Sequence, residues 1–272
     1  MRNFMLINAD GEQYRLMTRQ RFLYSPGGLG YEIDDTFARL GTKYVPIETG
    51  YAQGKIKGNL YFTQPNAYQK YYDFVRFCQK TPLTLAYTPD IGTFYRECKI
   101  SQIDKTELNQ SAALDVQVEL IALGLWYRTA TAINDGEQTG GKIYTYSYPY
   151  TYGESAGVLR MQSGSYEDSP AKLTIFGPVT NPTWRHFVNG EEIATGGIIG
   201  TVAEGLKLVI DATQTPYTIT SQDSYGNIVT NLYELSDFST ERFIILRHGS
   251  NVVTVEGGTQ VMLEGRLSYA SV

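Results

Sequence analysis

The sequence offers few side chains of the kinds that catalyse reactions or bind metal ions. It contains two histidines, His186 in an alternating segment and His248 in a predicted turn, and neither has a second histidine at metal-ligand spacing. Two histidines in such contexts support no Ser-His-Asp set. The 28 acidic residues could supply a glycosidase pair, but no motif singles out two of them. We therefore expect no enzymatic activity, no catalytic residues, and no metal or other cofactor.

Nucleotide and nucleic-acid sites are equally weak in this sequence. Gly28-Leu29-Gly30 provides permissive backbone, but the Lys-Ser/Thr ending and the following helix of a phosphate loop are absent. The nearest basic cluster is Arg15, Arg19 and Arg21, in a chain whose net charge is −5. A nucleic-acid-binding protein normally carries a basic stripe. We expect no sequence-specific binding of nucleic acid.

The cysteines and the N-terminal segment indicate where the chain works. Cys78 and Cys98 are too few for a disulfide scaffold or a structural zinc site, and their apolar neighbours predict buried, reduced thiols. The first apolar run is broken by Asn8 and Asp10, so it does not resemble a secretory signal. No apolar run approaches the roughly 20 residues that cross a bilayer. We expect a soluble protein, made in the cytoplasm and without membrane insertion.

Residues 1–130 are predicted to form a β-rich domain with one packed helix. An Asp-Gly turn joins two short strands into a hairpin, and further strands are expected at 55–62, 83–87, 94–100 and 114–120. A helix is expected at 66–80, with an apolar face of Tyr68, Tyr71, Tyr72, Val75 and Cys78. Of these, Tyr71, Tyr72 and Val75 should face the sheet. Residues 27–54 are interpreted as a long loop that could reach a neighbouring molecule.

Residues 131–156 are predicted to connect this domain to a second one. They contain a polar, glycine-rich stretch and then tyrosine at every second position over 144–152, which places five tyrosines on one face of an extended strand. We interpret this as an aromatic strand lying along a domain surface, with a stacking platform for sugars or bases as the alternative. Limited proteolysis is expected to cut between the two domains.

Residues 157–272 are predicted to form a jelly-roll or sandwich of short strands. The expected strands are 171–178, 184–188, 206–211, 218–221, 228–230, 243–246 and 252–255. Asn189-Gly190 is the strongest hairpin signal, and residues 248–251 are expected to join the last two strands as a second hairpin. The segment 265–270 is a candidate for returning to the first domain.

The order of these elements resembles one known family. The features that carry the resemblance are the Asn-x-x-Gly hairpin, Pro-Gly-Gly-Leu-Gly at 26–30, Gly-Asn-Leu-Tyr-Phe at 58–62, the aromatic helix 66–80, Leu125-Trp126-Tyr127, the tyrosine-alternating connector, and Gly-Pro-Val-Thr-Asn-Pro at 177–182. In these features the chain resembles the distal tail protein (Dit) family of long-tailed phages that infect Gram-positive bacteria. The resemblance covers nearly the whole chain.

The resemblance implies an architectural role in the virion. Six copies would form a ring at the distal end of the tail, assembled in the host cytoplasm, with the N-terminal domain forming the ring and a galectin-like C-terminal domain outside it. The implied partners are the tail tube protein, the tail-associated fibre or lysin protein, and receptor-binding or accessory baseplate proteins, while DNA only passes through the bore. The first hairpin and residues 27–54 are candidates for one ring contact.

Two other classes of function stay open at this point. The chain could be a carbohydrate-binding module for cell-wall glycans, with Trp184 and Tyr225 as stacking residues, although Trp184 at a strand start equally suits a core position. A galectin-like fold does not by itself confer sugar binding. A glycan-degrading tail enzyme would need a pair of carboxylates in a cleft.

Overall fold

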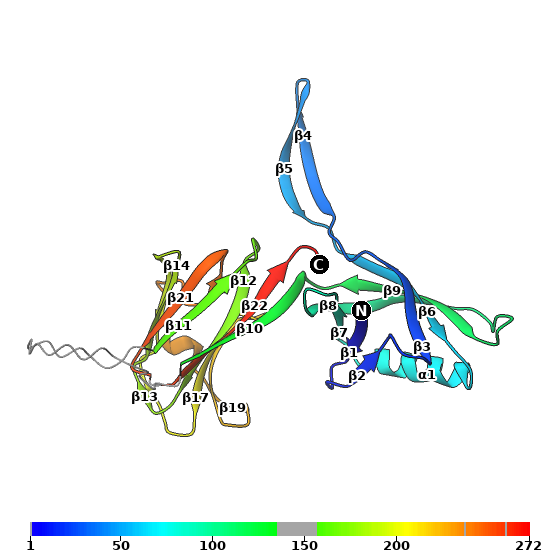
Figure 1. Cartoon of the computed structure of the whole chain (residues 1–272). Coiled ribbons are helices and arrows are strands. Elements are labelled where there is room, and N and C mark those ends of the chain that lie inside the picture. The colour runs from blue at the N-terminus through cyan, green and yellow to red at the C-terminus, as the bar shows by residue number, and fades with distance from the viewer. Residues whose placement is uncertain (1, 135–156, 237, 259) are drawn as a thin grey trace, which may run out of the picture. The chain divides into compact units, whose positions relative to one another are not determined.

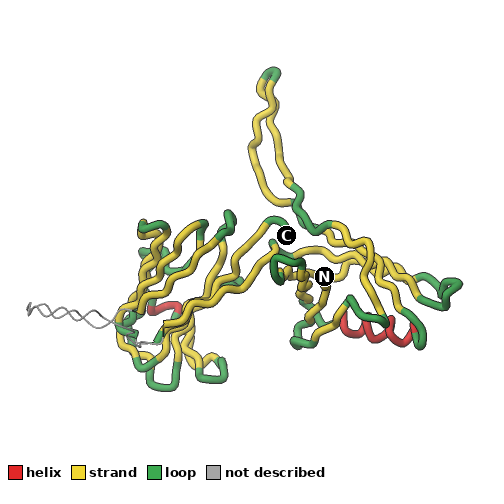
Figure 2. Tube along the Cα trace, viewed as in Figure 1, coloured by secondary structure: helices red, strands yellow, loops and turns green. Residues whose placement is uncertain are grey.

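A computed structural model describes residues 2–134, 157–236, 238–258 and 260–272. The chain divides into two compact units, of which unit 1 comprises Met1–Arg128 with Tyr269–Val272 and unit 2 comprises Thr129–Ser268. Strands make up most of each unit (Figure 2). The prediction of a mainly β protein is confirmed. Apart from residues 131–134, the predicted connector, including the alternating tyrosines 144–152, lies outside the described residues.

Unit 1 combines one α-helix with an antiparallel sheet (Figure 1). Its elements are β1 (Asn3–Ile7), β2 (Gln13–Arg15), β3 (Arg21–Gly27), β4 (Ile33–Leu40), β5 (Lys43–Tyr51), β6 (Lys55–Phe62), α1 (Ala67–Cys78), β7 (Leu83–Thr88), β8 (Phe94–Lys105), β9 (Leu114–Ala122) and the start of β10 (Trp126–Asn134). The predicted first hairpin is confirmed as β1 and β2. The strand predicted at 114–120 also forms, and its residues alternate in burial because one face of β9 covers the core.

The strands of unit 1 pair around a closed circuit. The order β1-β7-β8-β9-β6-β3 follows from the strand pairings. Leu16 closes the circuit, since its N–H donates to the carbonyl of Phe4 at 2.8 Å and its carbonyl accepts from the N–H of Leu23 at 2.9 Å. Inward-facing side chains such as Leu6, Leu60 and Leu85 are fully buried. This small barrel is therefore a packed core.

The helix forms where it was expected, but the predicted apolar face is only partly correct: Cys78 is buried and Tyr71 packs against Phe62, whereas Tyr72 and Val75 do not lie in the core. The residues buried on α1 are Ala67, Phe74, Phe77 and Cys78. Tyr72 is exposed, and Val75 is only half-buried. Phe74 packs against Tyr14 and Phe62, with ring centroids 5.4 and 6.0 Å apart. The helix is aromatic on several sides, so a second set of residues at spacings of three and four faces the barrel.

Residues 27–54 are not an irregular loop. Most of them form β4 and β5, a long antiparallel hairpin that turns at Gly41 and pairs with no other described strand. We call this hairpin, residues 33–51, the arm. It extends away from the barrel of unit 1 (Figure 1). The prediction of a loop is therefore wrong. The strands were missed because all residues of β5 and most of β4 are exposed, so their sequence carries no core-facing pattern.

Unit 2 is a sandwich of two antiparallel sheets. Its elements are the remainder of β10, β11 (Gly157–Ser163), β12 (Ser169–Phe176), β13 (Val179–Thr180), β14 (Thr183–Val188), β15 (Glu191–Gly197), β16 (Thr201–Val202), β17 (Lys207–Asp211), β18 (Thr218–Gln222), β19 (Ile228–Asn231), the 3₁₀ turn η1 (Tyr233–Leu235), β20 (Ile245–Leu246), β21 (Gly249–Glu256) and β22 (Val261–Tyr269). One sheet has the order β19-β18-β17-β12-β22 and the other β11-β21-β14-β15. A Cβ on Gly265 of β22 would lie 3.0 Å from the Met161 sulfur of β11, so the two sheets pack closely.

One predicted hairpin of unit 2 is wrong. Asn189-Gly190 does join β14 to β15, as predicted. In contrast, β20 pairs with β12, whereas β21 pairs with β11 and β14. Residues 247–248 therefore pass from one sheet to the other. Two apolar runs around a polar tetrapeptide satisfy the pattern for a hairpin equally well when each run is buried in a different sheet.

Candidate interaction surfaces

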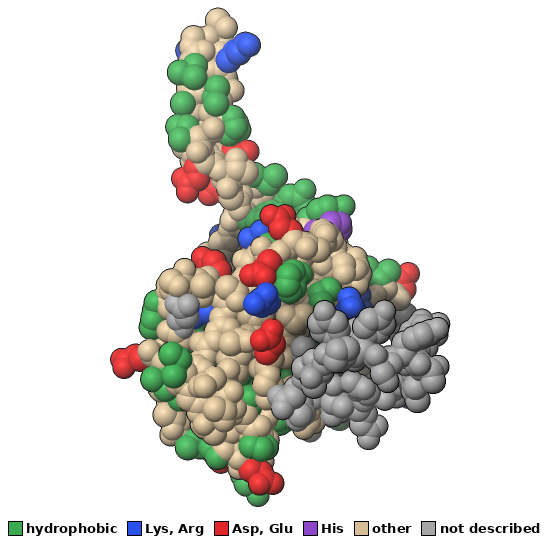
Figure 3. Space-filling view, turned by 90° about the vertical axis from the view of Figure 1, so that its left-hand side faces the viewer, with side chains coloured by type: hydrophobic (Ala, Val, Ile, Leu, Met, Phe, Trp, Pro, Cys, Tyr) green, Lys and Arg blue, Asp and Glu red, His purple; other side chains and the backbone are tan. Residues whose placement is uncertain are grey.

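The arm of unit 1 carries large apolar side chains that are exposed to solvent. They are Ile33, Phe37, Leu40, Tyr44, Val45, Ile47 and Tyr51. Charge is segregated along the hairpin, with Arg39 and Lys43 at its free end and Asp34, Asp35 and Glu48 nearer the barrel. Figure 3 shows hydrophobic side chains along the arm and basic ones at its tip. Exposed apolar surface of this extent marks an interaction site.

The base of the arm is fixed by buried side chains. Trp126 donates from its indole nitrogen to the carbonyl of Leu29 at 3.1 Å. Arg96 is buried, donates from Nε to the carbonyl of Gly124 at 2.8 Å, and lies with its guanidinium carbon 5.5 Å from the Trp126 ring centroid. Burial lowers the pKa of the Arg96 guanidinium. A Cβ on Gly54 would lie 2.5 Å from Arg96 Nη2, so the guanidinium packs directly on the returning backbone.

Gly28 explains the glycine-rich turn that precedes the arm. Its φ is +79°, and a Cβ there would lie 1.8 Å from the carbonyl oxygen of Lys55. Only glycine fits such an approach between two backbones. The residues that resembled part of a phosphate loop therefore have a structural role, since they bring the chain past β6 into the arm.

Two open clefts flank η1 in unit 2. We call Leu232–Ser236 the ridge. It is anchored on one side by the Leu232 N–H, which donates to the carbonyl of Ile219 at 2.9 Å, and on the other by an antiparallel bridge between Ser236 and Ile198. The first cleft has a volume of about 810 Å³ and the second about 650 Å³. Glu234 lines both clefts.

The linings of the two clefts differ in chemistry. The first is rich in hydrogen-bonding side chains, including Asn181, Thr183, Arg185, Thr195, Thr240 and Glu256. The second cleft contains the aromatic rings of Tyr217 and Tyr233. Apart from Glu234, its other lining residues are the polar Thr218, Thr220 and Asn231 and the apolar Pro216 and Ile228. Each cleft is large enough for a small ligand or for part of a longer one.

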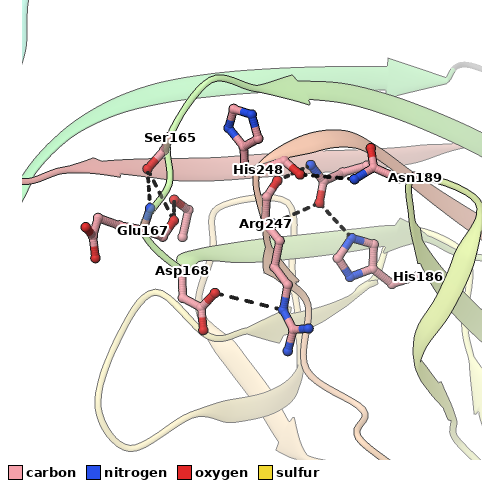
Figure 4. A network of polar contacts seen from close by, with 9 residues as sticks. Ser165, Glu167, Asp168, His186, Asn189, Arg247 and His248 are labelled. Carbon is pink, nitrogen blue, oxygen red and sulfur yellow. Dashed lines mark hydrogen bonds and ion pairs between the residues drawn. The ribbon is translucent and has the colours of Figure 1, made fainter.

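The two histidines lie in different surroundings within a region of polar contacts in unit 2 (Figure 4). His186 is fully buried on β14, and its Nε2 lies 3.1 Å from Oδ1 of Asn251. Burial lowers the pKa of His186, and the hydrogen bond to Asn251 opposes that shift. The ring of His248 instead stacks on Tyr166, with centroids 4.1 Å apart. Each imidazole thus has its own structural surroundings, and no hydrogen bond joins the two.

A family model described as the N-terminal domain of distal tail protein matches residues 3–123, which include the barrel, the helix and the arm. Residues 3–123 therefore match the N-terminal domain of the distal tail protein family. The resemblance found in the sequence is thereby confirmed. By this match the chain is a structural component of the phage tail.

Solved structures extend the likeness in fold to the whole chain. A chain of the phage P2 baseplate, in its activated conformation with Ca, is 17% identical and has a TM-score of 0.70, with 100% of both chains covered. The same baseplate with Sr gives 15% identity and a TM-score of 0.70. The crystal structure of SPP1 Dit, described as a paradigm of hub adsorption apparatus in phages infecting Gram-positive bacteria, is 8% identical over 98% of this chain and 99% of that one, with a TM-score of 0.65. No curated protein sequence matches the chain.

The two predicted sugar-stacking residues lie in different places in unit 2. Trp184 has an exposed fraction of 0%, so neither face of its ring is open to a ligand. It instead donates from its indole nitrogen to the carbonyl of Arg242 at 2.8 Å, and it packs against Gly196, which lines the first cleft. Tyr225 is 91% exposed in the turn between β18 and β19. The structure does not bring the two rings together.

Other residue groups with chemical potential have structural positions. Cys78 and Cys98 are free and buried, as predicted, and burial raises the pKa of each thiol to about 12. Within the described residues, no group of three or more His, Cys, Asp or Glu side chains is placed to hold a metal ion. Likewise, no helix in the described part of the chain has the length and hydrophobicity needed to span a membrane.

One motif was not identified in the sequence analysis. Gly153-Glu154-Ser155-Ala156-Gly157 has the Gly-x-Ser-x-Gly spacing of a hydrolase nucleophile. That motif works at a sharp turn from a strand into a helix. Here Gly157 begins strand β11, and the other four residues lie outside the described part of the chain. The strand that follows does not fit a nucleophile turn.

Proposed function

We propose that six copies of the chain form a closed ring at the distal end of the phage tail. Unit 1 corresponds to the expected ring-forming domain and unit 2 to the galectin-like domain outside the ring. The ring joins the tail tube protein to the tail-associated fibre or lysin protein and to receptor-binding or accessory baseplate proteins. Assembly takes place in the host cytoplasm, the bore passes DNA without sequence recognition, and the protein has no enzymatic activity.

The observation that supports this proposal most strongly is the arm. An isolated two-stranded hairpin is only marginally stable in water, and this one exposes seven large apolar side chains. A second copy would cover that surface. Ring contacts are head-to-tail, so each subunit needs two different patches, and the arm supplies one of them. The basic tip of the arm, with Arg39 and Lys43, would suit an acidic surface on a neighbouring copy.

The test is the mass of the assembled protein measured by light scattering and native mass spectrometry. The purified full chain is examined alone and with the tail tube and fibre proteins. Ile47→Asp places a charge on the arm and should abolish the hexamer. Ile91→Asp is the matched control, because Ile91 lies in the β7–β8 turn and is 64% exposed, compared with 68% for Ile47.

Two results would contradict the proposal. One is a wild-type chain that stays monomeric even when both tail proteins are present. The other is an Ile47→Asp variant that assembles as the wild type does. A control variant that assembles while the arm variant does not would assign the contact to the arm.

A further inference from the structure

The ridge between the two clefts of unit 2 is rigid and aromatic. The hydroxyl of Tyr233 accepts a hydrogen bond from Nη2 of Arg242 at 3.0 Å. The Arg242 guanidinium carbon also lies 5.0 Å from the Tyr233 ring centroid and 5.6 Å from that of Phe243. Beneath this layer, Trp184 holds the backbone of Arg242. A ligand would therefore meet a preformed surface and would not have to order a loop.

The second cleft presents one ring that is open to a ligand. Tyr217 is 43% exposed, and its inner side contacts Phe243, with centroids 5.0 Å apart. This packing fixes the ring while part of it remains in solvent. An exposed aromatic ring of this kind suits a flat ligand face lined with C–H groups, and the pyranose ring of a sugar has such a face.

Two polar side chains with unused hydrogen-bonding groups line the same cleft as Tyr217. Asn231 accepts the N–H of Tyr233 through Oδ1 at 3.0 Å, which orients the amide, and no described residue bonds to its Nδ2. No described residue forms a hydrogen bond or ion pair with the Glu234 carboxylate, which faces both clefts. An amide and a carboxylate together match the donors and acceptors of sugar hydroxyls.

The charges of the lining residues indicate which class of ligand the clefts could bind. Among the lining residues, Arg185 is the only cation, and Glu234 and Glu256 are the anions. A polyanion such as a nucleic acid or a phosphate-linked polymer would need an excess of positive charge. The lining therefore suits a neutral ligand. Because the clefts share Glu234, a ligand that fills both must be extended and must cross the ridge.

We propose that the two clefts form one groove that binds a neutral, extended polysaccharide. Tyr217 is the stacking residue, and Asn231 and Glu234 supply hydrogen bonds. Trp184 is a positioning residue that packs against Gly196, which lines the first cleft, and it holds the ridge in place. The groove lies wholly within unit 2, so this binding goes beyond ring assembly and does not depend on it.

The test is titration calorimetry of the full chain with neutral oligosaccharides. The probes are oligomers of glucose, galactose, rhamnose and N-acetylglucosamine, from disaccharides to longer chains. Affinity for the preferred sugar should rise with chain length until both clefts are filled. Tyr217→Ala and Glu234→Gln should each weaken binding by about ten-fold, the effect of losing one well-placed contact. Tyr225→Ala is the matched control, because it removes an exposed tyrosine that does not line either cleft.

Several outcomes would overturn the proposal. They are the absence of binding to every neutral probe, an equal loss of affinity in Tyr217→Ala and Tyr225→Ala, and tighter binding of a phosphate-linked polymer. Groove variants that lose a tail-protein complex, when the wild type binds no sugar, would assign the groove to a protein instead. Light scattering on the same variants shows whether the ring still assembles, which separates a failure of this proposal from a failure of the ring.

Discussion

Truncating Phe74 tests the observed face of α1. Phe74 is 1% exposed and packs between Tyr14 and Phe62, so Phe74→Ala leaves a cavity beside two rings. Such a change lowers the free energy of unfolding by about 3–5 kcal/mol. Val75 is half-buried, and Val75→Ala removes two methyl groups that are partly in solvent, which costs about 1 kcal/mol. The expected order of stability is wild type, then Val75→Ala, then Phe74→Ala.

Urea denaturation followed by tryptophan fluorescence measures this difference. The chain has two tryptophans, Trp126 in unit 1 and Trp184 in unit 2. In a Trp184→Phe background, Trp126 reports the unfolding of unit 1 alone. The midpoint should fall much further for Phe74→Ala than for Val75→Ala, with the slope unchanged. An equal fall for both, or a larger one for Val75→Ala, would refute the assignment of the helix face.

Three further predictions concern burial and backbone geometry. Because burial lowers the pKa of His186 in the folded state, its contribution to stability is complete above the ordinary pKa of 6.5 and is lost as pH falls towards the lowered value. The fall in melting temperature of unit 2 between neutral and mildly acidic pH should therefore be smaller in His186→Gln. Cys78 and Cys98, with pKa values raised to about 12, should not react with a thiol reagent at pH 8 until the protein is unfolded. Gly28→Ala should lower the melting temperature of unit 1 by several degrees in calorimetry, because its Cβ would collide with the backbone of β6.

The elements that cover a core were predictable from the sequence. In β9, apolar and polar residues alternate because one face is buried, and the pattern is visible without any knowledge of partners. The Asn189-Gly190 turn was predictable for a similar reason, since its backbone conformation favours those residues. The helix was found, but its orientation was not, because the aromatic residues of α1 satisfy helical spacing on more than one side.

The surfaces were much harder to predict. The arm covers no core of its own chain, so burial imposes no periodicity on its sequence, and it was interpreted as a loop. The groove combines residues from 181 to 256 that converge only through the sheet topology of unit 2. Trp184 was singled out by residue type alone, whereas its role depends on Gly196 and Arg242, which no local pattern connects to it.

The return of Tyr269–Val272 to unit 1 makes unit 2 an insertion. The polypeptide leaves unit 1 after Arg128 and re-enters it at Tyr269, whose ring meets Phe94 edge to face with centroids 5.4 Å apart. Two covalent crossings therefore connect the units, and one backbone break between them leaves a single polypeptide link intact. A recombination that exchanges unit 2 between related proteins would have to replace the internal segment Thr129–Ser268 and keep the residues on both sides of it. A simple truncation before unit 2 would also strip the final residues from the barrel.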